Sequence, residues 1–286
     1  YRQWAFEGLQ DGQWQGISTD WVYPIGALAP MLLAAVFGYG PYQFAWFLIF
    51  TGLNAAAFAV LTAERTRQRC IAAYWWLGIT ALLGPVAVGR IDGLTAPLVI
   101  IGLLWLGTRP VIASLLLSAA TWIKVWPAAV ILAVLAVSKQ RLTLLVTGAA
   151  FSAVVAAVVT AAGGLRHLLS FMGAQGDRGM QLEAPFTTPG LWQAILGRSD
   201  AHIYEDTVIN TREVRGALGE PVAALMTPLL ALAAVAVVLL LVWALRRGAD
   251  TGALLAAGSL ALVSAFIVFN KVGSPQFMLW LGAVVA

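Results

Sequence analysis

Residues 221–245, PVAALMTPLLALAAVAVVLLLVWAL, decide the fold of this protein. The stretch holds no charged residue and exceeds the roughly 20 apolar residues that an α-helix needs to cross a bilayer. Residues 142–162 have the same character. Both runs are continuous and rich in Ala, Leu and Val rather than alternating, so they predict membrane-spanning helices and not the strands of a barrel.

The composition of the whole chain agrees with a membrane protein. Of its 286 residues 60% are hydrophobic and only 10% are charged, and the mean hydropathy is +0.85. A soluble domain carries about 25% charged residues. Cys70 is the single cysteine, which excludes an internal disulfide framework. The net charge of +4 follows from basic loops between membrane segments and does not indicate a nucleic-acid partner.

The apolar segments predict one all-α transmembrane domain over residues 1–286, a polytopic bundle of about eight or nine membrane helices plus interfacial helices. The predicted membrane segments are 25–37 (too short to span alone), 42–61, 71–88, 94–106, 111–137, 142–162, 221–245, 254–269 and Gln276 onward. Residues 1–23 are expected to form an outer loop with an interfacial helix, and 164–220 a long outer loop with two more. The chain begins at Tyr1 without a methionine and its last apolar run, 276–286, stops in mid-helix, which predicts a fragment truncated at both ends.

Loop charge predicts the orientation of the bundle. Four short loops are rich in Arg and Lys, namely residues 64–69, 109, 139–141 and 246–250. The positive-inside rule assigns them to the cytoplasm, so the polar loops of this multi-pass protein would face outward from the plasma membrane. Arg109 and Lys139 lie on one side only if the run between them forms two short helices that meet near Lys124. Pro127 favours a break there.

Three basic residues are then expected on the outer face: Arg90 in GRIDG (89–93), Lys124 in WIKVWP (122–127) and Lys271 in NKVGSPQ (270–276). Lys and Arg are natural partners of a phosphate. Burying a charged side chain in or beside a membrane costs free energy, so such residues are functional candidates by default. Arg90 could instead pair with Asp92, and Lys271 could snorkel at a helix end. The three together predict a site for an anion.

The first outer loop offers a candidate general base. Asp20 stands beside Trp21 and just before Tyr23-Pro24, closer to the bundle than the other acids of this loop. His167 and His202 are far apart in sequence, and we interpret them as interfacial or hydrogen-bonded residues. No Gly-rich phosphate loop and no Cys/His spacing of a metal site occurs in the sequence, so we expect neither a nucleotide site nor a metal or other cofactor.

Several motifs together resemble glycosyltransferase family 87, a family of multi-spanning C-type glycosyltransferases that includes actinobacterial phosphatidylinositol mannosyltransferases. The motifs are WVYP at 21–24, Lys124 three residues before Pro127, RGMQLE at 178–183 ahead of Thr188-Pro189, and Asn270 ahead of SPQF at 274–277. The likeness extends over essentially the whole chain.

The resemblance implies a polyprenyl-phosphate-sugar donor, usually carrying mannose, which is bound within the membrane lipids. The sugar would be transferred with inversion to a lipid or glycan acceptor on the extracytoplasmic face. Arg90, Lys124 and Lys271 would hold the donor phosphate. The residues implied at the substrate are Tyr23, Asp92, Glu183, Asn270 and Gln276.

One departure from the family pattern concerns the base. In the family the catalytic aspartate stands just before a tyrosine after the first helix. If Tyr1 is that tyrosine, the base lies upstream, Asp20 is the fallback, and these residues alone would be inactive. A lipid or small-anion transporter or flippase, and a non-catalytic scaffold of envelope polysaccharide assembly, stay open as alternatives.

Overall fold

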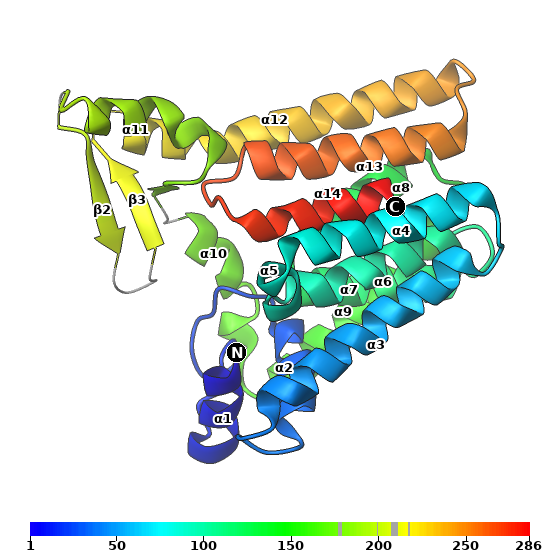
Figure 1. Ribbon diagram of the computed structural model, residues 1–286, viewed down its shortest axis with the longest axis horizontal. Coiled ribbons are helices and arrows are strands. Elements are labelled where there is room, and N and C mark those ends of the chain that lie inside the picture. Colours follow the sequence, from blue (N-terminus) through cyan, green and yellow to red (C-terminus); the bar gives the residue numbers. More distant parts are fainter. Residues whose placement is uncertain (177–178, 199, 207–210, 217) are drawn as a thin grey trace.

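The computed structural model describes residues 1–176, 179–198, 200–206, 211–216 and 218–286. Long helices lie side by side, and a small sheet and short helices gather at one end of them (Figure 1). The helices are α1 (Arg2–Asp11), α2 (Leu28–Ala35), α3 (Tyr42–Thr62), α4 (Arg67–Leu83), α5 (Pro85–Gly89), α6 (Asp92–Trp105), α7 (Pro110–Ile123), α8 (Pro127–Val137), α9 (Arg141–Ala161), α10 (Ser170–Gly176), α11 (Thr188–Ile195), α12 (Gly219–Arg246), α13 (Thr251–Val268) and α14 (Met278–Val285). Four single turns of 3-10 helix join them: η1 (Ile25–Ala27), η2 (Leu165–His167), η3 (Pro185–Thr187) and η4 (Pro275–Phe277).

The long helices present apolar side chains outward. Within the described residues, α3, α9, α12 and α13 are long and apolar enough to cross a membrane, and five shorter apolar segments accompany them. Only 11% of the apolar window of α9 and of α12 is buried, so side chains such as Val154 and Leu239 are exposed. A surface this apolar requires lipid around it. The protein is therefore membrane-embedded, and the predicted helical bundle is confirmed.

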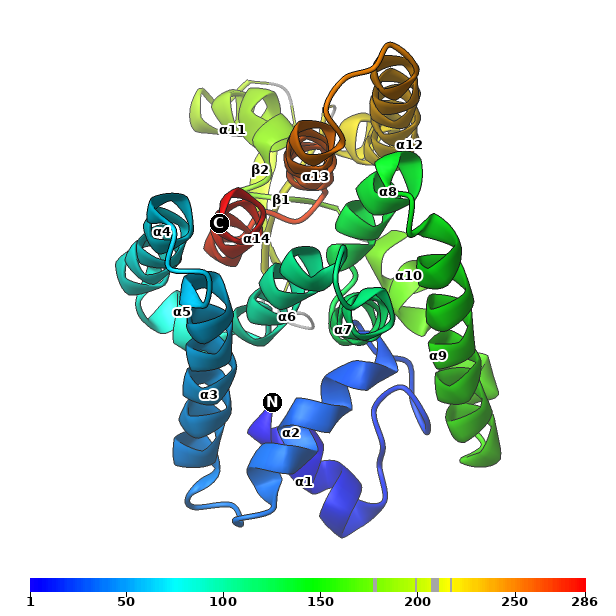
Figure 2. The ribbon, with the colours of Figure 1, turned by 90° about the vertical axis from the view of Figure 1, so that its right-hand side faces the viewer.

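Helix α6 forms the centre of the bundle. It is buried along most of its length and packs against α3, α7 and α14, as Figure 2 shows for its neighbours α3 and α7. Small residues allow this close packing: a Cβ added at Gly102 would lie 3.0 Å from the Leu117 Cγ atom of α7.

The predicted membrane segment 71–88 was wrong as a single helix. The structure divides it into α4 and α5 at Gly84, whose φ of 49° and ψ of −121° suit glycine alone. Pro85 then begins α5, where its missing N–H costs no hydrogen bond. The break turns the chain at the end of α4 and brings residues 89–91 to the start of α6.

The apolar run 111–137 folds as the two short helices that the charge pattern predicted. Helix α7 ends at Ile123, Lys124 is extended with φ −151° and ψ 135°, and Pro127 begins α8. Lys124 therefore lies at a helix end and not within an uninterrupted span.

Two hydrogen bonds show that α7 and α9 run parallel. The Ser114 hydroxyl donates to the Leu144 carbonyl over 3.1 Å, and the Trp122 indole N–H donates to the Ser152 hydroxyl over 3.0 Å. Because α8 connects these two parallel helices, it must return the chain between them. The basic loops before α7 and before α9 therefore lie at the same end of the bundle.

Residues 164–220 contain more than the two helices expected there. Besides α10 and α11 they form a three-stranded antiparallel sheet of β1 (Met180–Gln181), β2 (His202–Asp206) and β3 (Thr211–Arg215), in the order β1-β3-β2. Val214 pairs with both Met180 and Ile203 in this register. The sheet was not predicted from the sequence, because its strands have only two to five residues and β1 pairs with a strand 30 residues further along the chain. Arg178 of the 178–183 motif lies outside the described residues.

Candidate functional site

The candidate residues gather at one end of the bundle, which we call the polar end. It comprises residues 1–24, 89–92, 124–126 and 270–276 together with the described part of 163–218 (Figure 1). The basic loops that precede α4, α7, α9 and α13 lie at the opposite end.

A cluster of aromatic rings anchors the first loop to the bundle. Tyr1 stacks on Trp46 of α3 with 5.0 Å between ring centroids. Trp21 packs edge-on against Trp4 and Tyr23, each at 5.5 Å. Such ring pairs contribute about 0.5–1.5 kcal/mol beyond the area they bury. The predicted loop with a helix at 1–23 is thus a packed part of the polar end.

This cluster brings two of the three basic segments together. The Lys124 ammonium lies over the Tyr23 ring, 4.4 Å from its centroid, in a cation–π contact. Tyr23 in turn packs against Tyr1 at 6.2 Å, and the Tyr1 hydroxyl accepts a hydrogen bond from the Ile91 N–H over 3.2 Å. The exposed Arg90 side chain directly precedes Ile91. The segments of Lys124 and Arg90 therefore flank the same tyrosine pair.

Burial also alters the chemistry of Tyr1. Desolvation raises the pKa of the Tyr1 phenol well above its usual value of 10.0, and the neighbouring Tyr23 and Asp92 act in the same direction, while the Ile91 hydrogen bond opposes them. The hydroxyl therefore stays protonated at neutral pH.

Asp92 does not pair with Arg90. Its side chain is fully buried, and its Oδ1 atom accepts a 2.7 Å hydrogen bond from the Trp280 indole N–H of α14. Its Oδ2 atom has no hydrogen-bond partner among the described residues. The alternative of a loop salt bridge for Arg90 is therefore wrong, because Asp92 is buried against Trp280 while the Arg90 side chain is exposed.

The third basic segment joins the polar end through its backbone. The Lys271 carbonyl accepts a hydrogen bond from the Gln181 N–H over 2.9 Å, and Gly273 lies against the backbone of Glu183, where a Cβ would clash. The Asn270 side chain caps this turn by accepting from the Val272 N–H over 3.0 Å.

The following turn, η4, connects this segment with the rest of the site. It packs against α5 and α6, and its Gln276 side chain is buried. The Glu183 side chain, in contrast, is exposed. Asn270, Lys271, Glu183 and Gln276 therefore belong to one neighbourhood, which meets the Arg90 segment through α5.

Asp20 lies at the side of this group, in a contact that the sequence did not indicate. Its Oδ1 atom is 2.5 Å from the His167 Nδ1 atom, and the Arg166 Nε–H donates to His167 Nε2 over 2.8 Å. An acceptor at Nε2 leaves the proton on Nδ1, so we assign His167 as the donor to Asp20. Asp20 remains 76% exposed, which leaves its other oxygen accessible. The 147 residues between the partners carry no signal of this pairing.

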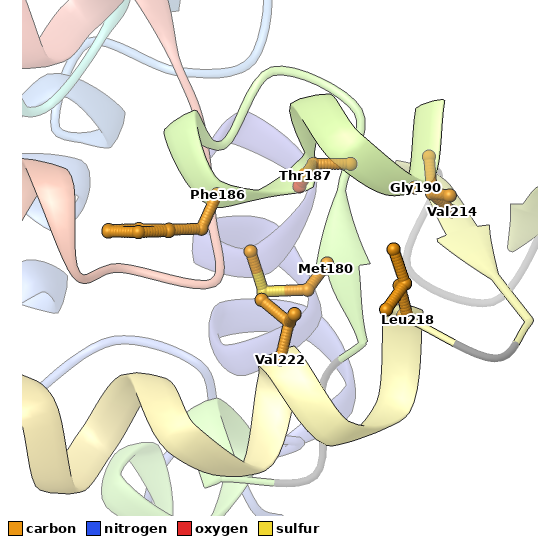
Figure 3. A pocket seen from close by; sticks show the side chains of 8 residues that line it. Met180, Phe186, Thr187, Gly190, Val214, Leu218 and Val222 are labelled. Carbon is orange, nitrogen blue, oxygen red and sulfur yellow. The ribbon is translucent and has the colours of Figure 1, made fainter. Parts of the chain in front are cut away.

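A small cavity at the polar end is not a substrate site. Its volume is about 10 Å³, about the minimum for one water molecule, and its lining is almost wholly apolar. Figure 3 shows Met180, Val222 and Leu218 facing this gap beneath η3 and α11. It is a packing gap in the small sheet-bearing region. No group of three His, Cys, Asp or Glu side chains that could hold a metal ion occurs within the described ranges.

Comparison with known proteins finds a matching family. A family model described as glycosyltransferase family 87 matches residues 21–269. No curated protein and no solved structure matches the chain. The matched range includes Tyr23, Arg90, Lys124 and Glu183, begins directly after Asp20, and ends before the Lys271 segment.

Proposed function

The chain belongs to glycosyltransferase family 87, and on that premise we propose that it transfers mannose, with inversion, from a polyprenyl-phosphate donor to a lipid or glycan acceptor. The acceptor would be bound at the polar end, on the extracytoplasmic side of the plasma membrane. Support for this orientation comes from the parallel α7 and α9, which place their basic loops together at the opposite end.

The observation that carries the proposal is the meeting of basic segments from distant parts of the chain. Lys124 and the Arg90 segment flank the Tyr1–Tyr23 pair, and the Lys271 segment reaches α5 and α6 through η4. A polyprenyl phosphate needs no proton in order to leave, but it needs positive charge beside the departing oxygen. Three cations at the membrane boundary would meet that need without a nucleotide site.

The reaction then requires one exchange of bonds. The bond between the sugar anomeric carbon and the phosphate oxygen breaks, and the acceptor oxygen bonds to that carbon from the opposite face. The electron pair stays on the polyprenyl phosphate, where Arg90, Lys124 and Lys271 would bind it. The acceptor proton passes to a carboxylate of the first loop, for which Asp20 is the candidate within this chain.

Replacement of Lys124 tests the proposal. The full-length protein is reconstituted in liposomes with a radiolabelled polyprenyl-phosphate-mannose donor and an extract of envelope lipids as acceptor. Lys124→Ala is expected to lower the rate by roughly 100- to 1,000-fold, since it removes one stabilising charge from the transition state. Lys139→Ala is the matched control, because Lys139 is an exposed lysine at the opposite end.

The other outcomes decide against the role of Lys124 or against sugar transfer as a whole. Equal activity of Lys124→Ala and Lys139→Ala would show that Lys124 does not bind the donor phosphate. Movement of the labelled lipid across the bilayer without sugar transfer would favour the transporter or flippase. Absence of both transfer and movement would favour the scaffold.

A further inference from the structure

Two tryptophans at the base of the polar end form a stacked pair. The rings of Trp126 and Trp280 lie 5.6 Å apart at an interplanar angle of 7°. Both indole N–H groups donate into the first turn of α6: Trp280 to the Asp92 carboxylate over 2.7 Å and Trp126 to the Thr95 hydroxyl over 3.0 Å. The Thr95 hydroxyl donates onward to the Asp92 carbonyl over 3.1 Å. All four residues are buried, so the hydrogen bonds form a network closed to solvent.

Each of the three segments that meet in this network carries one of the basic residues. Asp92 follows Arg90 by two residues, and Trp126 follows Lys124 by two. Trp280 belongs to α14, which η4 joins directly to the turn that carries Lys271. One buried point therefore links the three cation-bearing segments, which are far apart in sequence.

Stability does not require a carboxylate at this point. A fully buried carboxylate loses its hydration, and here its Oδ2 atom regains no hydrogen bond among the described residues. Apolar residues of similar volume often stabilise a protein as well as a buried polar group does. What an apolar side chain cannot supply is a directed acceptor that fixes the Trp280 ring, and with it α14, in one orientation.

We propose that Asp92 is a positioning residue of the phosphate site. Its carboxylate fixes Trp280 and so holds the Lys271 segment against the Arg90 segment. Because Trp280 stacks on Trp126, the same contact orients the Lys124 segment, so that all three cations reach one phosphate. This inference rests on the proposed function. It differs from the expectation that Asp92 contacts substrate, because here Asp92 acts through the tryptophans.

Variants of the Asp92–Trp280 pair separate position from charge. Asp92→Asn keeps the shape and an oxygen for the Trp280 N–H, whereas Asp92→Leu removes the acceptor and Trp280→Phe removes the donor. The measurement is the inhibition constant of polyprenyl phosphate, without sugar, against transfer by the full-length protein. We expect it to rise on the order of 10-fold in Asp92→Leu and in Trp280→Phe, since displacement by a fraction of an ångström weakens a convergent site. Asp92→Asn should stay within about twofold of the wild type.

Trp76→Phe is the matched control. The Trp76 indole N–H is also buried and donates over 2.9 Å to the Asn54 side-chain oxygen, a bond that joins α3 to α4, neither of which carries one of the three cations. The separate hydrogen bond from the Asn54 Nδ2 atom to the Gly93 carbonyl of α6 stays intact in this variant. We expect a loss of thermal stability like that of Trp280→Phe with an unchanged inhibition constant.

The outcomes distinguish the two proposals. An inhibition constant that rises equally in Trp76→Phe would show that the network only stabilises the fold, which overturns the positioning role. An Asp92→Asn variant as weak as Asp92→Leu would mean that the carboxylate charge itself is used, which overturns the positioning role. If Asp92→Leu does not fold, Trp280→Phe and Asp92→Asn decide between these results. If the wild-type protein transfers sugar and none of the variants changes the inhibition constant, this inference alone is refuted. If the wild-type protein does not bind polyprenyl phosphate, the proposed function is refuted.

Discussion

Gly26 in η1 offers a test of the polar end that leaves the charged residues unchanged. A Cβ at this position would lie 2.6 Å from the Trp122 carbonyl oxygen and 2.8 Å from its carbonyl carbon. Ordinary contact begins at 3.4 Å, so Gly26→Ala must separate η1 from the end of α7 by about 0.8 Å. The obstacle is backbone, which no rotamer change relieves. Tyr23 precedes η1 and Lys124 follows Trp122, so the shift moves the tyrosine ring away from the ammonium.

The expected cost is visible in both stability and rate. Overpacking of this kind lowers the free energy of unfolding by about 1–3 kcal/mol. Misplacement of substrate-binding groups by nearly an ångström lowers the rate by roughly 10- to 100-fold. Thermal unfolding in detergent and initial rates with labelled donor measure the two effects. Gly52→Ala is the control: nothing lies within 4 Å of its Cβ position in α3, so the variant should gain up to about 1 kcal/mol at unchanged rate. A Gly26→Ala protein with the wild-type rate would refute the assignment of this junction to the site.

Two further predictions concern titratable groups. Asp20→Asn keeps an oxygen for the His167 N–H but cannot accept a proton, so kcat should fall roughly 100- to 10,000-fold if Asp20 is the base. A near-normal kcat would leave Asp20 only the structural role of linking the first loop to η2. Burial raises the pKa of the Tyr1 phenol, so the folded protein holds this proton more tightly than the unfolded chain does. The resulting stability is complete below pH 10 and is lost as the pH rises further, and Tyr1→Phe should flatten that loss in unfolding measured at increasing pH; an unchanged profile would contradict it.

The sequence predicted the membrane helices well because a lipid environment imposes a one-dimensional requirement. Each spanning segment must be apolar over a fixed length, whatever its neighbours are. Loop charge extended this to the break at Lys124, since a single span would have put Arg109 and Lys139 on opposite sides. The break at Gly84 was not predicted, although a Gly-Pro pair such as Gly84-Pro85 is a turn signal in the sequence.

The candidate site was predicted less completely. The segments that carry the basic residues do lie together at the polar end, and Tyr23 meets Lys124 there. The partners that organise them were not foreseen: Trp280 is 188 residues from Asp92, and His167 is 147 from Asp20. Asp92 itself was expected at the substrate, and the structure shows it buried against a tryptophan.

Hydropathy and charge along the chain by themselves determined that this protein is a helical membrane bundle with basic loops at one end and polar loops at the other. Both properties are sums over local composition, which folding does not change. Only the tertiary structure decided which side chains touch, such as Lys124 on Tyr23 and Trp280 on Asp92. Those contacts depend on how helices pack and rotate against each other, and no local pattern encodes that geometry.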